Sequence, residues 1–207
     1  MTTVTGPLFV VLDGIDGCGK STQAARLVAR LAQESGRKVH HLREPGSTRV
    51  GEALRAILLG REHAPTASVE TLLFAAARAQ MLAEVVAPAL ERGELVVCER
   101  FHPSTFAYQA VAGGLPEADV LALLQHWAGE PKPTLVLLLE LSPEVAAARR
   151  AQSTDRIEDR GIEFQREVAR GYARYADLVS GVARIDAARS AEVVAQDVWW
   201  EISSALR

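Results

Sequence analysis

The chain alternates between short apolar runs and longer stretches in which apolar residues recur every three or four positions. Short apolar runs bounded by Gly, Pro or polar residues are typical of buried strands, whereas the longer spacing is typical of helices with one apolar face. The first run, Leu8–Leu12, is rich in β-branched and aromatic residues and ends at a glycine-rich turn. We therefore expect strands at 8–12, 39–42, 95–98, 135–141 and 184–186.

Helical spacing fills the intervals between these strands. In the first interval Ala24 and Leu31 share one face of a helix, and Gly36 is a residue type that readily ends it. Ser142 and Ser190 are suited to cap the N-termini of two later helices. We expect helices near 21–36, 51–59, 69–91, 116–127, from 143 onward, around 164–172 and after 190, and a loop after residue 101.

Apolar strands that alternate with amphipathic helices are typical of an α/β fold, a parallel sheet covered by helices on both faces. The pattern predicts a five-stranded parallel sheet, and 207 residues without a linker or repeat fit one domain, 1–207. In such sheets ligands bind beyond the carboxyl ends of the strands. Functional residues are therefore expected just after Leu12, Leu42, Cys98 and Leu141.

The first of these positions carries a phosphate-binding loop signature, Gly14-x-x-x-x-Gly19-Lys20-Ser21, between a strand and a helix. Its glycines let backbone N–H groups turn toward a polyphosphate, and the following helix N-terminus favours negative charge. Lys20 is expected to reach the β- and γ-phosphates, and the Ser21 hydroxyl to ligate Mg²⁺. The signature predicts a P-loop NTPase fold whose nucleotide site consists of Gly14, Ile15, Asp16, Gly17, Cys18, Gly19, Lys20, Ser21 and Thr22.

The amino-acid composition limits which kinds of partner the protein can bind. A net charge of −3, from 23 basic and 26 acidic residues, gives no electrostatic footprint for nucleic acid. The first residues lack the pattern of a signal peptide, and no apolar run approaches the roughly 18 residues of a membrane span. Cys18 and Cys98 have no Cys or His neighbours at metal-binding spacing. We interpret them as reduced thiols and expect a cytoplasmic protein with no membrane partner.

Five further segments, together with the P-loop, resemble thymidylate kinases, which are P-loop kinases that phosphorylate dTMP with ATP. The resemblance runs nearly end to end and implies small-molecule nucleotides as substrates, ATP as co-substrate, Mg²⁺ and a homodimer. The segments are REPGST (43–48), ETLLFAAARAQ (70–80), ERFHPSTFAYQ (99–109), DRIE (155–158) and FQREVARGY (164–172).

The resemblance assigns roles at the acceptor nucleotide. Asp16 meets the 3′-hydroxyl of the acceptor sugar, Phe74 stacks on thymine, Arg78 donates to a thymine carbonyl and Arg100 binds the acceptor phosphate. Without the motif, Phe74 and Tyr108 are better interpreted as core residues, and Thr105 and Gln109 as loop-capping groups. The implied acceptor site consists of Asp16, Arg43, Pro45, Arg55, Phe74, Arg78, Arg100, Ser104, Thr105, Tyr108 and Gln109.

A basic segment at about 149–160 resembles the mobile lid that closes over ATP. Some relatives carry an arginine where this chain has Gly17, so the lid is expected to supply catalytic charge from Arg149, Arg150 and Arg156. Lys20, Asp16 and Arg100 complete the predicted catalytic set. The other interpretation of the basic segment is a solvated helix end.

Two departures from the family pattern leave the acceptor open. The family commonly has Asp-Arg followed by Tyr or His where this chain has Glu99-Arg100-Phe101, and an arginine usually found after Gln109 is absent. Glu99 is predicted to bind Mg²⁺ with Ser21, the alternative being an ion pair with an arginine. Two alternative functions remain: a P-loop kinase for another nucleotide or nucleoside, and a non-catalytic nucleotide-binding switch.

Overall fold

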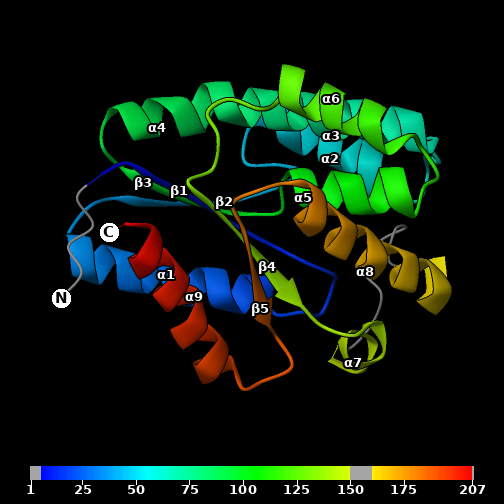
Figure 1. The fold of residues 1–207 in the computed structure, drawn as a ribbon. Helices are drawn as coiled ribbons and strands as arrows, with labels where there is room; N and C mark the ends of the chain where they lie inside the picture. Colours follow the sequence, from blue (N-terminus) through cyan, green and yellow to red (C-terminus); the bar gives the residue numbers. More distant parts are fainter. Residues whose placement is uncertain (1–5, 150–159, 207) are drawn as a thin grey trace.

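The computed structural model describes residues 6–149 and 160–206. Its centre is a sheet of five parallel strands in the order β2-β3-β1-β4-β5 (Figure 1). This confirms the predicted α/β class, and each strand lies within two residues of its expected position. The strands are β1 (Leu8–Asp13), β2 (Val39–Arg43), β3 (Leu95–Glu99), β4 (Leu135–Glu140) and β5 (Val182–Asp186).

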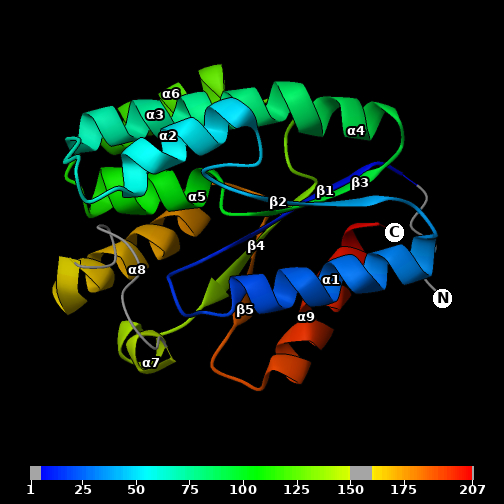
Figure 2. The same cartoon turned by 180° about the vertical axis from the view of Figure 1, so that it is seen from behind.

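Helices cover both faces of the sheet (Figures 1 and 2). In the described residues they are α1 (Lys20–Ser35), α2 (Arg49–Leu59), α3 (Ala67–Met81), α4 (Ala87–Glu91), α5 (His102–Thr105), α6 (Glu117–Trp127), α7 (Pro143–Arg149), α8 (Gly161–Leu178) and α9 (Ala191–Ala205), with π-helical turns η1 (Leu82–Val86) and η2 (Phe106–Val111). Gly36 ends α1 with a φ of 64°, and the Ser190 side chain caps α9, both as predicted.

The central strand β1 divides its side chains between two cores. Leu8, Val10 and Leu12 lie in the core that also contains apolar side chains of α1 and α9. Phe9 and Val11 pack on the other face, with side chains of η1 and α4. Alternation of this kind is what a strand requires when both faces of its sheet are covered.

The segment after β3, expected as a loop, is helical instead, and this expectation was wrong. Phe106 and Ala107 are fully buried, and η2 packs closely against α8. At the contact, a Cβ added to Gly171 would lie 2.6 Å from the Cα of Ala107, so only glycine permits this approach. Tertiary packing against a distant helix thus sets the local structure, and the local pattern of polar and aromatic residues did not reveal it.

The continuous helix formed by α3, η1 and α4 confirms the long helix expected at 69–91. Among the described residues this one helix, Ala67–Glu91, has the length and mean hydropathy, 1.3, that a membrane-crossing helix needs. Length and composition are weak evidence, because core helices of folded domains pass the same test. Here Met81, Leu82, Val86 and Ala89 of this helix are buried in the core against the sheet, which accounts for its apolar character.

Candidate active site

A cavity of about 820 Å³ opens beyond the carboxyl ends of the strands, at the edge where the sequence places its functional residues. Its walls come from the P-loop, the β2–α2 connection, α3, the segment after β3 and the β5–α9 connection. The predicted site residues that line it are Asp16, Gly17, Cys18, Gly19, Lys20, Ser21, Thr22, Arg43, Pro45, Arg55, Phe74, Arg78, Glu99, Arg100, Ser104, Thr105, Tyr108, Gln109 and Arg149.

The remaining predicted residues lie elsewhere. Gly14 and Ile15 are not part of the wall and meet the site through their carbonyl oxygens, which accept hydrogen bonds from Lys20 Nζ at 2.8 and 2.9 Å. Arg150 and Arg156 lie outside the described residues, as does most of the lid segment. Their predicted roles stay predictions.

Backbone geometry explains why the P-loop needs glycine. Gly14 has a φ of 142°, and a Cβ there would lie 2.4 Å from the carbonyl oxygen of Leu139 on β4. Gly19 has a φ of 96° immediately before α1, a conformation that L side chains rarely adopt. The loop thereby holds the Lys20 ammonium, with its Nζ 3.6 Å from Asp16 Oδ1, at the N-terminal end of a helix.

Asp16 joins the P-loop to the segment after β3. Its carboxylate forms an ion pair with Arg100 and accepts a hydrogen bond of 2.9 Å from the Tyr108 hydroxyl. Burial, together with the charge of Asp16, raises the pKa of Tyr108 well above its usual value, so the hydroxyl remains a donor. Arg100 takes up a left-handed backbone conformation, φ 68°, which is uncommon for a non-glycine residue and frequent at functional sites.

Asp13, which the sequence analysis did not identify, holds the segment after β3 in place through hydrogen bonds to its carboxylate. The fully buried carboxylate accepts hydrogen bonds from the Phe101 backbone N–H at 2.9 Å, the Ser104 hydroxyl at 2.6 Å and the Tyr172 hydroxyl at 2.9 Å. It thus ties β1 to α5 and α8. The signal was a carboxylate at the end of an otherwise apolar strand, directly before Gly14.

A buried ion pair forms the deep wall of the cavity. Arg78 donates through Nε to Glu44 Oε2 at 2.7 Å and through Nη2 to Thr105 Oγ1 at 3.2 Å. Burial raises the pKa of Glu44 to about 7, although the charge of Arg78 opposes the shift. Arg78 Nη1 is buried without a hydrogen-bond partner in the described part of the chain. An unsatisfied donor at a cavity wall is suited to a ligand carbonyl. Glu44 was also missed, although it lies in the REPGST segment.

Glu99 contacts a hydroxyl and an imidazole. The Ser21 hydroxyl donates to Glu99 Oε2 at 2.5 Å, and His41 Nε2 lies 2.8 Å from Glu99 Oε1. Within the described ranges, neither of these two partners of Glu99 is an arginine. Carboxylate and hydroxyl oxygens beside a phosphate-binding lysine match the ligand preference of Mg²⁺, which takes one or two protein oxygens together with substrate phosphates. The donor set therefore fits the predicted metal.

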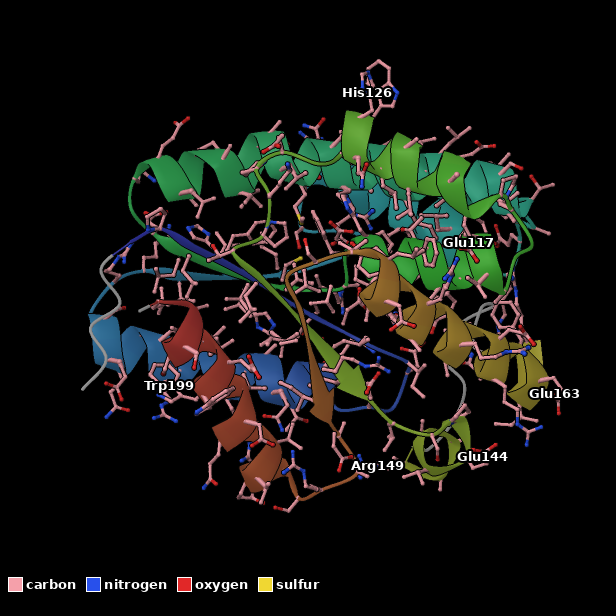
Figure 3. All side chains as sticks on the ribbon, viewed as in Figure 1. Glu117, His126, Glu144, Arg149, Glu163 and Trp199 are labelled. Atoms are coloured by element: carbon pink, nitrogen blue, oxygen red, sulfur yellow. The ribbon has the colours of Figure 1, made fainter. Side chains whose placement is uncertain are left out.

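The opposite end of the cavity is formed by the β5–α9 connection. Arg149, at the end of α7, donates to the carbonyl oxygens of Ala187 at 2.8 Å and Ala188 at 3.1 Å (Figure 3). No motif in the sequence marks this wall. The lining residues missed here are Ala187, Arg189, Ser190, Ala191 and Val194.

A parallel α/β sheet with a P-loop at its edge and an arginine-lined cavity beside it defines a kinase of the P-loop NTPase fold. A sequence profile of the family described as thymidylate kinase matches residues 12–198. The chain belongs to the thymidylate kinase family.

Relatives named thymidylate kinase match the chain over nearly their whole length. The relative from Symbiobacterium thermophilum is 40% identical over 197 residues, covering 92% of this chain and 90% of the relative. The Desulforudis audaxviator relative is 41% identical over 204 residues, covering 97% and 92%. The relative from Synechococcus sp. (strain JA-2-3B'a(2-13)) is 44% identical over 195 residues, covering 93% and 92%.

Proposed function

We propose that this chain transfers the γ-phosphoryl group of ATP to dTMP, giving ADP and dTDP. The family supports the reaction, and one observation supports its location. Asp16, inside the P-loop, contacts Lys20 on the triphosphate side and both Arg100 and Tyr108 on the acceptor side. A single carboxylate thereby links two substrate sites, as direct transfer between two nucleotides requires.

On the acceptor side, each wall offers a different chemistry. Arg100 binds the dTMP phosphate, and Asp16 accepts from the sugar 3′-hydroxyl. Phe74 stacks on the base, the buried Arg78 donates to the 4-carbonyl of thymine, and Gln109 meets the imide edge. Supporting residues of the same pocket are Arg43, Pro45, Arg55, Ser104, Thr105 and Tyr108.

On the donor side, Lys20 neutralises charge on the β- and γ-phosphates, while backbone N–H groups of the P-loop bind phosphate oxygens. Ser21 and Glu99 hold Mg²⁺, which when bound neutralises further phosphate charge. Gly17 has no side chain to offer the transferred group, so Arg149, Arg150 and Arg156 supply the remaining positive charge. Since Arg149 is bonded to the β5–α9 connection, it also forms part of the nucleoside wall.

The alternatives have no specific support. A non-catalytic switch has no need of an acceptor pocket that ends in a buried guanidinium. A kinase for an acceptor base other than thymine or uracil requires a hydrogen-bonding pattern different from the one that Arg78 and Gln109 offer.

We further propose that the whole chain, 1–207, is one catalytic domain with a lid at about 149–160, and that it acts as a homodimer in the cytoplasm. Exposed apolar side chains gather on two adjacent helices, Val50 and Ile57 on α2 and Val69 and Leu72 on α3. Apolar surface of this kind is suited to contact a second copy.

Product analysis with a P-loop variant tests the reaction. Wild-type protein with ATP and dTMP is expected to form ADP and dTDP in equal amounts. Lys20→Ala is expected to lose turnover by several orders of magnitude while its melting temperature shows a folded protein. Lys38→Ala removes an exposed lysine far from the P-loop and is expected to retain turnover. Near-normal turnover of a folded Lys20→Ala protein contradicts the assignment.

A further inference from the structure

Three residues from separate elements form a chain of contacts behind the acceptor pocket. Glu70 on α3 is fully buried, and each of its carboxylate oxygens receives a different donor. Arg160, directly before α8, lies with Nη2 3.0 Å from Glu70 Oε1. Gln109 on η2 donates through Nε2 to Glu70 Oε2 at 2.9 Å. The sequence motifs drew attention to Gln109 only.

This arrangement fixes which end of the Gln109 amide faces the cavity. An ionised carboxylate accepts hydrogen bonds and donates none, so Gln109 must turn its NH₂ group toward Glu70. The carbonyl oxygen is the other end of the same planar amide. Because Gln109 lines the cavity, that oxygen is the group it presents to a ligand. An amide without such a partner could rotate and present a donor as easily as an acceptor.

We propose that Glu70 and Arg160 are positioning residues that hold Gln109 as a hydrogen-bond acceptor and thereby select pyrimidines that carry a proton on N3. The proposal rests on the proposed function, since it assumes that the base lies beside Gln109. Thymine and uracil donate from N3–H, whereas N3 of cytosine is an acceptor. An acceptor facing an acceptor leaves both groups unsatisfied in a buried site, which is strongly unfavourable.

The selection is separate from that made by Arg78. Glu70 lies one helical turn from Phe74 and two from Arg78 along α3, so one helix carries all three side chains. Arg78 has its own carboxylate partner, Glu44, and its Nη1, which has no hydrogen-bond partner in the described part of the chain, is suited to the 4-carbonyl. Variants at Glu70 leave the Glu44–Arg78 pair in place, so a change in selectivity reports the Gln109 contact.

The orientation of the new amide in Glu70→Gln can be predicted, because the Arg160 guanidinium is only a hydrogen-bond donor. The new amide must turn its oxygen toward Arg160, which places its NH₂ group toward Gln109. Gln109 then rotates to accept with its oxygen and presents its own NH₂ group to the base. In the variant, Gln109 therefore presents a hydrogen-bond donor to N3 of the base where the wild type presents an acceptor. The shape of the site is almost unchanged.

The test compares kcat/KM for dTMP and 5-methyl-dCMP, two acceptors that share the methyl group and differ at the pairing edge of the base. The preference for dTMP is expected to fall by about tenfold or more in Glu70→Gln. In the exchanged pair Glu70→Gln/Gln109→Glu, position 109 can again only accept, so the dTMP preference is expected to return to within about threefold of wild type. In a Gln109→Ala background, adding Glu70→Gln is expected to leave the ratio unchanged.

Each outcome decides the proposal. An unchanged ratio in folded Glu70→Gln overturns it, as does a further fall when Glu70→Gln is added to Gln109→Ala. The exchanged pair decides alone if Glu70→Gln does not fold, because a loss of dTMP preference in that pair contradicts an acceptor at 109. A wild-type protein that does not phosphorylate dTMP overturns the proposed function instead.

Discussion

At the scale of single residues, histidine–carboxylate pairs occur at both ends of the strand pair β2–β3. His41 and Glu99 form one at the carboxyl end, where Glu99 lines the cavity and Ser21 contacts its other carboxylate oxygen. His40 and Glu94 form another, with 2.6 Å between Nε2 and Oε2, away from the cavity. Both pairs join an imidazole to a glutamate, although Glu94 also contacts Arg92 and Lys38, so Glu94 provides a comparison for Glu99 outside the cavity.

Glu99→Gln is expected to lower kcat/KM at least about tenfold, because it removes the charge that holds the metal while keeping the shape. Raising the Mg²⁺ concentration should relieve the defect in part, as mass action on a weakened site requires. Glu99→Asp keeps the charge and is expected to retain substantial turnover. Initial rates over a range of Mg²⁺ concentrations measure all three effects.

The matched control is Glu94→Gln, which alters the equivalent pair without touching the cavity and is expected to leave the Mg²⁺ dependence unchanged. Wild-type turnover of Glu99→Gln at limiting Mg²⁺ contradicts the metal role and leaves Glu99 as a structural partner of Ser21 and His41.

His102 makes stability depend on pH. Burial, and then the charge of Arg78, lower the pKa of its imidazole from 6.5 to about 3, while its hydrogen bond to the Ala128 carbonyl opposes the shift. Between these two pH values His102 therefore binds a proton in the unfolded chain and remains neutral in the folded chain. The stability contribution is present above pH 6.5 and is lost progressively as the pH falls toward 3.

His102→Gln keeps a donor for Ala128 but does not titrate. Between pH 6.5 and 4, the wild-type free energy of unfolding is expected to fall more steeply than that of the variant, by an extra amount on the order of 1 kcal/mol per pH unit. Urea unfolding at each pH measures this. His126→Gln changes an exposed histidine of α6, which points away from the fold in Figure 3, and should follow the wild-type slope. Parallel slopes for wild type and His102→Gln rule out the titration.

The sequence allows site residues that lie inside a motif to be predicted. It does not show which distant residues they contact in the folded chain. Asp16 and Glu99 lie in or beside the P-loop and ERF segments, so the sequence marked them. Asp13, Glu44 and Glu70 owe their roles to partners 34 or more positions away along the chain. Only the folded chain brings those partners within hydrogen-bond distance.

At the scale of elements, hydrophobic periodicity was sufficient wherever an element buries one regular face. The five strands and the long helices follow from it, and local capping at Gly36 and Ser190 sets two helix ends. The exception is α5–η2, whose burial depends on the close approach of Gly171. Its sequence mixes polar, aromatic and small residues without a single apolar face, so periodicity gave no signal.

The pair of helices α2 and α3 carries the surface that we assign to a homodimer. Leu72, 57% exposed on α3, is expected to lose most of its contact area to a second copy. Leu72→Glu should shift the protein toward monomer, because it buries an unpaired charge in the interface. Sedimentation velocity over a range of concentrations measures the shift.

Trp200→Glu is the matched control for this surface. Trp200 is 63% exposed on α9, on the other side of the sheet, and its replacement should leave the oligomeric state unchanged. A monomeric wild type, or dissociation caused by Trp200→Glu instead of Leu72→Glu, contradicts the proposed interface.

At the scale of the whole molecule, one edge of the sheet collects residues from nearly the full length of the chain. The P-loop, the ends of β2 and β3, helix α3 and the β5–α9 connection meet around a single cavity. Triphosphate chemistry follows from the first of these, and acceptor selection follows from the others. We infer that this cavity binds dTMP as the acceptor.

The most direct test is an ADP-release assay that compares kcat/KM for dTMP, dUMP and AMP under the same conditions. We predict that dTMP is the preferred acceptor and that dUMP, which lacks one methyl group, is about 10- to 200-fold poorer. AMP presents a purine that cannot match Arg78 and Gln109 together, so its turnover should be far lower. A preference for AMP over dTMP contradicts the account.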